Sequence, residues 1–572
     1  MSFGGWLRRR RLALGMTHAA LADRAHCSVS ALRKIESDER RPSRRLATRL
    51  AGCLQVDEAE LADFVGIARG ERRTDRLARV SAVALPSLPA PPEVAVFDAA
   101  MPSVAVLPFV NLGGDATNEH FADGLAEELL NVLTKIPGLR VVSRTSAFSF
   151  KGDRTTDVRT IARRLNVATV LEGSVRRVGS RVRVTAKLVE AASDSHRWSQ
   201  SYDRELGDLF AVQDDIAQAV VHELRSALLG GPPDAAARAS VEAQLRAATR
   251  GRTASAEAHE LCLLGRFLVD RLTPDDTSSG IGYLRRALQL DPRYALAWTG
   301  LAGAYSNQAG YGWAPMAPTF DLARAAARHA LAIEPDLAEA HAELGWVQIS
   351  HEWDWQAADA TYARALALGS GDRSIVGAAS VLADSLGRKD EAVALARRAA
   401  ALDPLSFIAH GNLALRCLNS GLLDEADGAL ESALRLNPRA ALLHAVLGTL
   451  RLEQGRPADA LAAFEQESLE ALRLSGITMS RDALGQHAQR DAAIKVLIEK
   501  CAHDGALQIA EAFAFIGDAD RAFEWLERAY TQRDSGLPQM QSWPLLRNLR
   551  SDARWRPFLE RMGLVARGAT PE

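Results

Sequence analysis

The sequence predicts a multidomain, mainly α-helical chain with three parts: a small five-helix head, a small α/β module and a long stack of helix pairs. Three observations carry this prediction. The first fifty residues are basic and hold short helical patterns, residues 103–228 mix strand and helix patterns, and the second half repeats one helical pattern. A chain of 572 residues is long enough for about three to five domains.

Composition narrows the class of protein. Apolar residues make up 47% and charged residues 24%, which are ordinary globular values and exclude a mostly disordered chain. The five cysteines form no CxxC pair, which argues against a zinc finger, a redox motif or a secreted disulfide scaffold. No signal peptide and no apolar run of about 18 residues is present, so we expect a cytoplasmic protein without a membrane span.

Charge is distributed unevenly along the chain. Residues 1–50 hold twelve Lys and Arg against four Asp and Glu, a balance of +8, while the other 522 residues carry −10. Such asymmetry points to an anionic polymer as the partner of the head. The alternative is a solvated helix face, and charge alone does not separate the two.

Helical patterns in the head cover residues 6–14, 18–25, 29–36, 44–54 and 57–69. Good N-cap residues precede three of them: Thr17, Ser28 and Ser43. In the third helix Leu32 and Ile35 face inward at i, i+3 spacing, and Pro42 prevents its continuation. Two helices joined by a short turn inside a small basic unit are the geometry that places a recognition helix in the major groove.

The stretch CSVSALRKIESDERRPSRRLA, residues 27–47, resembles the Cro/lambda-repressor (XRE) class of DNA-binding domain. The resemblance covers about residues 4–70, and we assign residues 1–70 to this domain. It implies binding of double-stranded DNA. Two positions depart from the family pattern, because His26 replaces the usual turn Gly and His18 replaces the usual Gln.

Positions within the head predict the roles of its side chains. Three residues on the exposed side of the third helix are expected to meet base edges: Val29, Ser30 and Arg33. Eight are expected to contact the DNA backbone: Thr17, His18, Ser28, Lys34, Arg40, Arg41, Ser43 and Arg44. For Glu36 we favour an internal salt bridge over DNA contact, and we favour a solvated helix face for at least two of Arg8–Arg11.

Residues 71–101 form a Pro- and Ala-rich linker, expected to be an extended spacer. Residues 102–230 then predict strands at 103–109 and 139–143, helices at 121–136 and 158–165, a hairpin around Gly179 and Ser180, a strand at 196–203 and a closing helix at 209–228. The segments AVLPF, FADGLAEEL, RVVSRTS, VLEGSVRR and RVTAKL resemble the TolB N-terminal-like module.

No phosphate-binding glycine motif occurs in this module. Small polar residues follow the first strand, where ligands often bind: Asn111, Gly113, Gly114, Asp115 and Asp123. A plain loop and helix start explain them as well, and we favour that. Arg144, Thr145 and Ser146 after the second strand have the same two interpretations.

After a second linker at 231–256, residues 257–535 form a repeat array. Trp298-x2-Leu301-Ala302-x2-Tyr305 fits the tetratricopeptide (TPR) pattern, and the frame recurs at His341, His410 and His444, after steps of 43, 69 and 34 residues. The step of 69 residues is long enough for one further repeat unit, which we place near Ile375. The step of 43 residues predicts one unit with a nine-residue insertion at GYGWAPMAP. We expect about eight helix pairs, closed by a capping segment at 536–572.

Two residue sets in the array have alternative roles. The three histidines recur where another unit has Trp298, so we expect packing or hydrogen bonding and no metal ligation. Trp313, Trp353 and Trp355 lie in or beside loops, where they contact a partner peptide or, more often, cap the packing between repeats.

These features predict a DNA-binding transcriptional regulator whose TPR array recruits or senses a protein or peptide partner. The alternative is a TPR interaction scaffold with a non-specific or vestigial DNA-binding head, and a small-molecule sensor built on the α/β module is compatible with either. No HExxH, GxSxG or paired-carboxylate pattern is present, so we expect no enzyme, no catalytic residues, no metal and no cofactor. Whether the chain forms a homodimer is a question that the sequence leaves open.

Overall fold

The structure is a computed structural model, and it describes residues 3, 7, 11, 21–22, 24–25, 27–36, 40–54, 56, 61–69, 102–113, 117–134, 136, 139–152, 156–178, 181–193, 195–205, 212, 215–223, 253 and 255–565. The expected linker at 71–101, most of that at 231–256, and Thr17 and His18 lie outside these residues. The chain separates into two compact units, Met1–Glu93 and Val94–Glu572. It is multidomain and mainly α-helical, as predicted.

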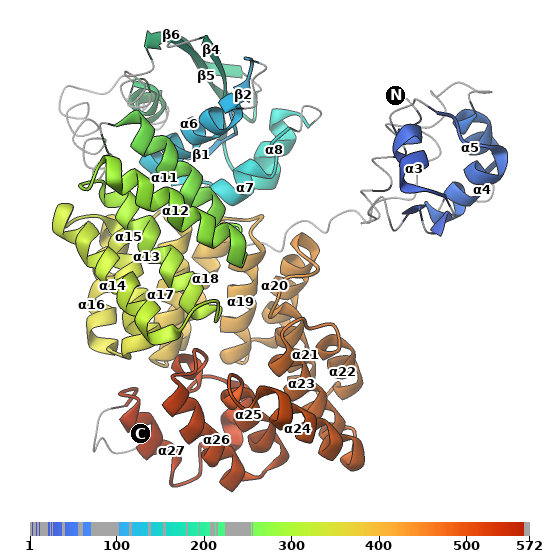
Figure 1. The fold of residues 1–572 in the computed structure, drawn as a ribbon, viewed down its shortest axis with the longest axis vertical. Coiled ribbons are helices and arrows are strands. Elements are labelled where there is room, and N and C mark those ends of the chain that lie inside the picture. Colours follow the sequence, from blue (N-terminus) through green and yellow to red (C-terminus); the bar gives the residue numbers. More distant parts are fainter. Residues whose placement is uncertain are drawn as a thin grey trace. The chain divides into compact units, whose positions relative to one another are not determined.

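The first unit contains three described helices, α3 (Val29–Glu36), α4 (Arg44–Cys53) and α5 (Leu61–Ala68) (Figure 1). They enclose one apolar core, in which Leu32, Ile35, Leu50 and Phe64 are fully or almost fully buried. The inward positions predicted for the third helix are therefore correct. Ser28 and Ser43 precede α3 and α4, and their hydroxyls accept hydrogen bonds from the backbone N–H groups of Ala31 and Leu46.

The second unit begins with a mixed sheet of strands β1 (Ser103–Val106), β2 (Val110–Asn111), β3 (Arg140–Val141), β4 (Thr169–Val178), β5 (Arg181–Glu190) and β6 (Ser195–Glu205). The strand order is β3-β1-β4-β5-β6, with β2 also paired to β4. β1 runs parallel to β3 and β4, whereas β4, β5 and β6 are antiparallel neighbours. The predicted hairpin is thus present and continues into a third long strand.

Helices cover the two faces of this sheet. Val104 and Val106 of β1 pack with α6 (Thr117–Thr134) and helical residues 215–223, while Ala105 between them packs with α8 (Val158–Leu165). This alternation is what a strand buried on both faces requires. The predicted helix at 158–165 is confirmed, but the strand expected at 139–143 is only the two residues of β3, because α7 (Arg144–Phe148) begins directly after Ser143.

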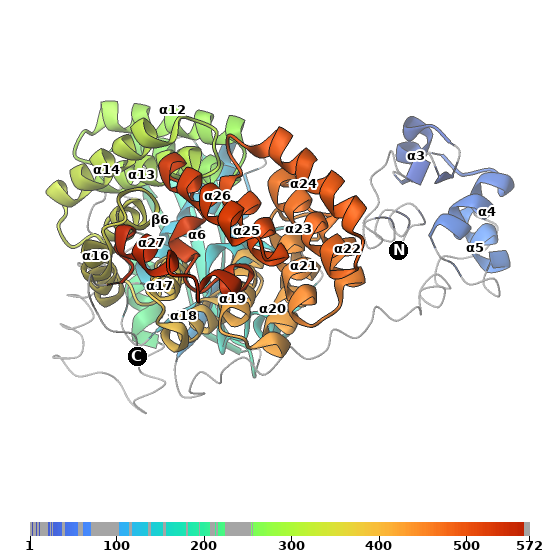
Figure 2. The same cartoon turned by 90° about the horizontal axis from the view of Figure 1, so that it is seen from below.

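The repeat array contains eight helix pairs between Ala256 and Gln532, all within described residues. Figure 2 shows them following one another around a curved path. Their bounds are α11 (Ala256–Val269) and α12 (Pro274–Leu290); α13 (Ala295–Gly310) and α14 (Met316–Ile333); α15 (Ala338–Val347), a π-helical turn η4 (Gln348–Glu352) and α16 (Trp355–Leu368); α17 (Arg373–Ser385) and α18 (Lys389–Leu402); α19 (Phe407–Asn419) and α20 (Leu423–Leu436); α21 (Leu443–Glu453) and α22 (Pro457–Phe464); α23 (Glu470–Ala483) and α24 (His487–Cys501); α25 (Ala506–Ile516) and α26 (Ala519–Gln532).

The periodic small residues have the expected structural roles. Gly387, Gly421 and Gly455 all have positive φ, of 74°, 77° and 70°, at the turn inside their helix pairs. Glycine adopts this left-handed conformation without the steric cost that a Cβ brings. The predicted nine-residue insertion is not a single loop, however. α13 and α14 have 16 and 18 residues, against 13 and 14 in α19 and α20, so most of the extra length extends helices.

A recurring hydrogen bond explains the histidine positions. Nε2 of His341, His410 and His444 lies 2.9 Å from the carbonyl oxygen of the proline six residues earlier. A carbonyl accepts only, so each ring donates from Nε2. Trp298 makes the same bond with its indole N–H, 3.0 Å from the carbonyl of Pro292. The prediction of structural, hydrogen-bonding histidines is confirmed.

The C-terminal segment does more than cap the last repeat. It contains short helices η5 (Leu537–Gln539) and η6 (Pro544–Leu549) and the helix α27 (Trp555–Arg561), and η6 packs on α25. It also reaches back to the middle of the array: Ser542 donates to the backbone carbonyl of Asp384 on α17, 2.9 Å away, and Trp355 of α16 donates to the carbonyl of Met562, 2.6 Å away. The early and late repeats are therefore joined through their own tail.

Trp353 and Trp355 belong to this closure. Both are under 10% exposed, and Trp353 lies beside Tyr530 and under the guanidinium of Arg533. Packing, the alternative favoured for them, explains both side chains. Among the described residues no helix is long and apolar enough to cross a membrane.

Candidate nucleic-acid interface

The candidate interface is built on α3. Its start is fixed by Ser28, whose Oγ accepts from the N–H of Ala31 at 3.1 Å, and its inner face by Leu32 and Ile35. Successive helical residues rotate by about 100°. Positions 30, 33 and 34 therefore fall opposite the buried face and position 29 at its border. The backbone of Val29, Ser30 and Arg33 is helical as predicted, while their side chains lie outside the described part.

The N-terminus of α4 adds a cationic surface next along the chain. Arg40, Arg41, Arg44 and Arg45 are all exposed there, and the exposed Ser43 caps the helix through a 3.3 Å bond from the N–H of Leu46. A helix N-terminus carries partial positive charge and unpaired N–H groups, which suit a phosphate. Exposed guanidiniums strengthen that preference because they form charge-assisted hydrogen bonds with phosphate oxygens.

Lys34 and Arg41 are two of the residues predicted to contact the DNA backbone. Lys34 of α3 is exposed, as a phosphate contact requires. Arg41 is exposed too, but its Nη1 donates to the backbone carbonyl of Arg69 at 3.2 Å, just beyond the end of α5. Arg41 thus has a structural contact in addition to its predicted one, and its substitution would perturb both.

A buried ion pair holds α3 against the N-terminal helix region. Arg11 and Glu36 form two hydrogen bonds, of 2.6 and 3.0 Å, and both side chains are only about 5% exposed. The salt bridge predicted for Glu36 is confirmed. The sequence did not identify its partner, because the expectation of a solvated face for at least two of Arg8–Arg11 does not single out Arg11 as the buried one. Sequence offers a weak signal for it, because Arg11 follows Leu7 by four residues, on the same helical face.

In the second unit, the ligand candidates of the α/β module have structural roles where they are described. The side chain of Asn111 accepts from the N–H of Gly113 at 2.9 Å, and Asp123 pairs with Lys151. Gly114 and Asp115 lie outside the described residues. These contacts match the plain loop-and-helix interpretation.

Arg144 and Ser146 attach the module to the array. The hydroxyl of Ser146 is fully buried, donates to the carboxylate of Asp403 and accepts from the N–H of Leu405 at 2.8 Å. Arg144 pairs with Glu127 at 2.9 Å and lies over the ring of Phe267 of α11. These residues contact two repeats, which the sequence did not indicate.

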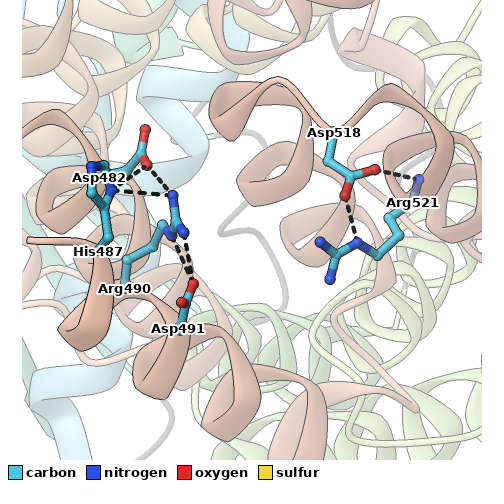
Figure 3. Close-up of polar contacts among 6 residues, drawn as sticks. All are labelled: Asp482, His487, Arg490, Asp491, Asp518 and Arg521. Carbon is cyan, nitrogen blue, oxygen red and sulfur yellow. Dashed lines mark hydrogen bonds and ion pairs between the residues drawn. The ribbon is translucent and has the colours of Figure 1, made fainter. Parts of the chain in front are cut away.

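Two separate groups of charged residues lie in the last two repeats (Figure 3). Arg490 of α24 pairs with Asp482 at the end of α23 at 2.7 Å, and with the adjacent Asp491. Asp518 caps α26 by accepting from the N–H and Nε of Arg521. The backbone N–H of Arg521 is the main reason that the pKa of Asp518 lies below its usual range. Each of these carboxylates therefore has an arginine partner within its own repeat.

A buried carboxylate lies under the C-terminal segment. Glu511 of α25 is 4% exposed, and this burial, reinforced by Asp534, raises its pKa to about 8. Trp543 of the segment lies beside it. Among the described residues no group of three or more His, Cys, Asp or Glu is arranged to hold a metal ion.

Comparisons with known proteins agree with the head's geometry. Residues 2–64 match a helix-turn-helix domain family. A curated protein named "Putative adenylate cyclase 3" from Rhizobium meliloti (strain 1021) is 37% identical over 203 residues, which is 36% of this chain and 32% of that protein. The chain thus spans about a third of the length of this curated relative.

Two solved structures are partly similar in fold. PilF of Pseudomonas aeruginosa is 22% identical, with a TM-score of 0.30, over 37% of this chain and 97% of that one. YrrB, described as a TPR protein with an unusual peptide-binding site, is 17% identical, with a TM-score of 0.25, over 37% of this chain and 97% of that one. The chain thus has a match to a helix-turn-helix domain at residues 2–64 and, in its own structure, eight helix pairs between Ala256 and Gln532.

Proposed function

We propose that this chain is a cytoplasmic, DNA-binding transcriptional regulator of the XRE type, whose TPR array recruits or senses a protein partner. The observation that carries the proposal is the head itself: a capped, well-anchored α3 with three outward positions, followed directly by the cationic start of α4. In helix-turn-helix proteins such a helix enters the major groove, while neighbouring groups bind phosphates.

Residue roles follow from this docking. Val29, Ser30 and Arg33 would read base edges, with Arg33 forming a bidentate contact to guanine. Lys34, Arg40, Ser43 and Arg44 are exposed and would bind phosphates, as would Arg41 beside its contact with Arg69. Ser28 would act mainly as the cap of α3, and Thr17 and His18 would complete the backbone contacts.

For the array, the described surface offers one aromatic feature suited to a peptide or protein partner. Tyr311 stacks on Trp313 at 4.9 Å in the loop between α13 and α14, and Tyr311 is 56% exposed. Exposed aromatic residues are enriched at protein interfaces. The α/β module, which resembles the TolB N-terminal-like module, would act as a rigid attachment to the repeats.

We propose no catalytic role. The cyclase name belongs to a relative of which this chain covers 32%. Incubating the purified chain with ATP and divalent cation and measuring cyclic AMP tests this directly. Formation of cyclic AMP above a boiled-protein control would overturn the non-enzymatic assignment.

The experiment that tests DNA binding uses the full chain and a random duplex library, selected and sequenced at low and moderate salt. An enriched motif would establish sequence-specific binding. Binding that enriches nothing and disappears as salt rises would reflect phosphate attraction alone and favour the alternative, a TPR scaffold with a non-specific head. An Arg33→Ala chain is the matched control, because it should lose enrichment at one base and keep phosphate binding.

A further inference from the structure

Residues 537–550, the strap, connect α26 to α27 without forming a ninth helix pair. The strap contains the short helices η5 and η6, and Pro544 prevents the two from merging into one longer helix. Five of its large apolar side chains are buried against the array: Leu537, Met540, Leu545, Leu546 and Leu549. The strap is therefore bound along its length to repeats that precede it in the chain.

The helices that hold the strap belong to the inner row of the array. The first helices of successive pairs contact one another, as α17 does with α19, α19 with α21 and α23 with α25. Second helices of neighbouring pairs, all of them described, make no comparable contact. The more closely spaced row of a curved stack lies on the inside of the curve. Figure 2 accordingly shows α22 and α24 on the outer side of the late repeats.

Polar contacts attach the strap to four of these first helices. The pairs are Gln539 with Arg416 on α19, Ser542 with Asp384 on α17, Arg547 with Glu453 on α21 and Asn548 with Ala514 on α25. In each pair the array residue is one of the last four residues of its helix. The strap thus crosses equivalent positions of several repeats, as a bound peptide would.

The contact of Gln539 leaves buried polar atoms without partners. Arg416, Asp384 and Asn419 are at most 4% exposed and bond to one another. Nε of Arg416, Oδ1 of Asp384 and Oδ1 of Asn419 nevertheless have no hydrogen-bond partner among the described residues. A buried donor or acceptor that stays unpaired is destabilising. A ligand that supplies two donors and one acceptor here would therefore compete with the strap.

We propose that this inner face, lined by Asp384, Arg416, Asn419 and Glu453, binds a partner peptide, and that the strap is a built-in competitor which the peptide displaces. The peptide brings a primary amide side chain to the three buried residues, because an amide offers two donors and one acceptor. In place of Arg547 it brings a cationic side chain to Glu453, whose own side chain is 12% exposed.

Displacement of the strap does not require the array to open. The strap is flanked by α26 and α27, and the chain beyond α27 is held separately, since Trp355 of α16 donates to the carbonyl of Met562. Residues 533–554 can leave as a loop while both ends stay in place. The inference rests on the proposed partner role of the array, for which it names a surface and a ligand chemistry, and it does not depend on DNA binding.

Hydrogen exchange of the unaltered full chain, followed by mass spectrometry, tests the displacement. The amides of Met540 and Leu546 bond to carbonyls within the strap. They should exchange at least about tenfold faster than amides within α25 and α27, because the strap opens on its own. Equal exchange in the strap and α25 would mean a permanent seal, and equally fast exchange in α27 would mean fraying of the C-terminus. Either result overturns the proposal.

A synthetic peptide with the sequence of residues 536–551, labelled with fluorescein, tests the surface itself by anisotropy. In a Glu453→Arg chain the strap's own Arg547 meets a like charge, which weakens its binding. This chain should bind a peptide carrying Arg547→Glu about tenfold more tightly than the unaltered peptide, because only the former restores opposite charges. Adding Gln539→Leu to that peptide should weaken its binding, since the amide no longer reaches Arg416.

Glu431→Arg on α20 is the matched charge control, because Glu431 is 71% exposed on a second helix. That chain should bind neither peptide more tightly than the unaltered chain does. Equal binding of the two peptides to the Glu453→Arg chain, or no binding, would overturn the proposal. The selection of duplexes by the head is measured separately, so a failure here leaves the proposed DNA binding standing.

Discussion

Arginine is abundant in both the head and the repeat array, but its side chains make different contacts in the two regions. In the head Arg40, Arg44 and Arg45 project from the surface next to a helix N-terminus. In the array, arginines pair with carboxylates of the next unit: Arg324 with Glu352 at 2.9 Å and Arg397 with Glu425 at 2.6 Å, each 28 residues apart. An arginine-rich segment therefore indicates a polyanion partner only where acids do not recur at matching spacing.

A third class of arginine is buried and pairs with a buried carboxylate. Arg416 and Asp384 are about 1% and 0% exposed, and their ion pair is 3.1 Å long. Asn419 also donates to Asp384, and Arg416 donates to Gln539 of the C-terminal segment. Arg11 and Glu36 play the same part in the head. The predictions below test whether burial and partner, and not residue type, set the size of each effect.

The largest effect is expected for Arg416→Ala. It leaves the Asp384 carboxylate buried without its cation, which costs about 3–5 kcal/mol. Denaturant unfolding of the full chain, followed by tryptophan fluorescence, measures the change in free energy of unfolding. The double variant Arg416→Met/Asp384→Leu is the control and should lose much less, because no uncompensated charge remains. A single variant as stable as the parent would refute a structural role for the pair.

Arg33→Ala should cost about 1–3 kcal/mol of DNA-binding free energy and relax the preference at one base pair. Arg44→Ala is its counterpart and should weaken all sequences alike, lowering the salt slope by about one. Fluorescence anisotropy on matched and single-mismatch duplexes at several salt concentrations distinguishes the two. Equal losses on every duplex for Arg33→Ala would show that it contacts phosphate only.

A pH dependence is expected from Glu511. Its folded-state pKa is raised to about 8 from an ordinary value of 4.5, so the folded state holds a proton that the unfolded chain releases. Stability from this group is complete below about pH 4.5 and is lost as pH rises through about 8. Glu511→Gln should flatten the fall in unfolding midpoint between pH 5 and 8 and exceed the parent at pH 8. An unchanged pH profile would mean that another group titrates.

The smallest effect is expected for Arg364→Ala. Arg364 pairs with Asp336, but the two side chains are 51% and 38% exposed. Solvent and salt screen such pairs, whose contribution is about 0–1 kcal/mol. Calorimetry should show a small shift in Tm that disappears at high salt. A loss of unfolding free energy as large as that of Arg416→Ala would show that burial of an ion pair does not set its contribution to stability.

Features governed by neighbours in sequence were predictable. The caps Ser28 and Ser43, the bounds of α3 and α8, and the inward Leu32 and Ile35 follow from helix geometry and local hydrogen bonding. The eight helix pairs, with their turn glycines and proline–histidine bonds, follow from a repeating pattern in which each unit contacts its neighbours.

Contacts between distant segments were decided by the tertiary structure alone. Ser146 and Asp403 meet across 257 residues, Ser542 and Asp384 across 158, and Arg11 and Glu36 across 25. Nothing in the local pattern of any of these residues specifies its partner, because a serine or arginine is compatible with many surroundings until packing selects one. The sequence by itself determined α3, α8, the caps Ser28 and Ser43 and the repeat register. The attachment of the module and the closure of the array by its tail depend on which surfaces the folded chain brings together, since burial and pairing there involve residues with no periodic signature.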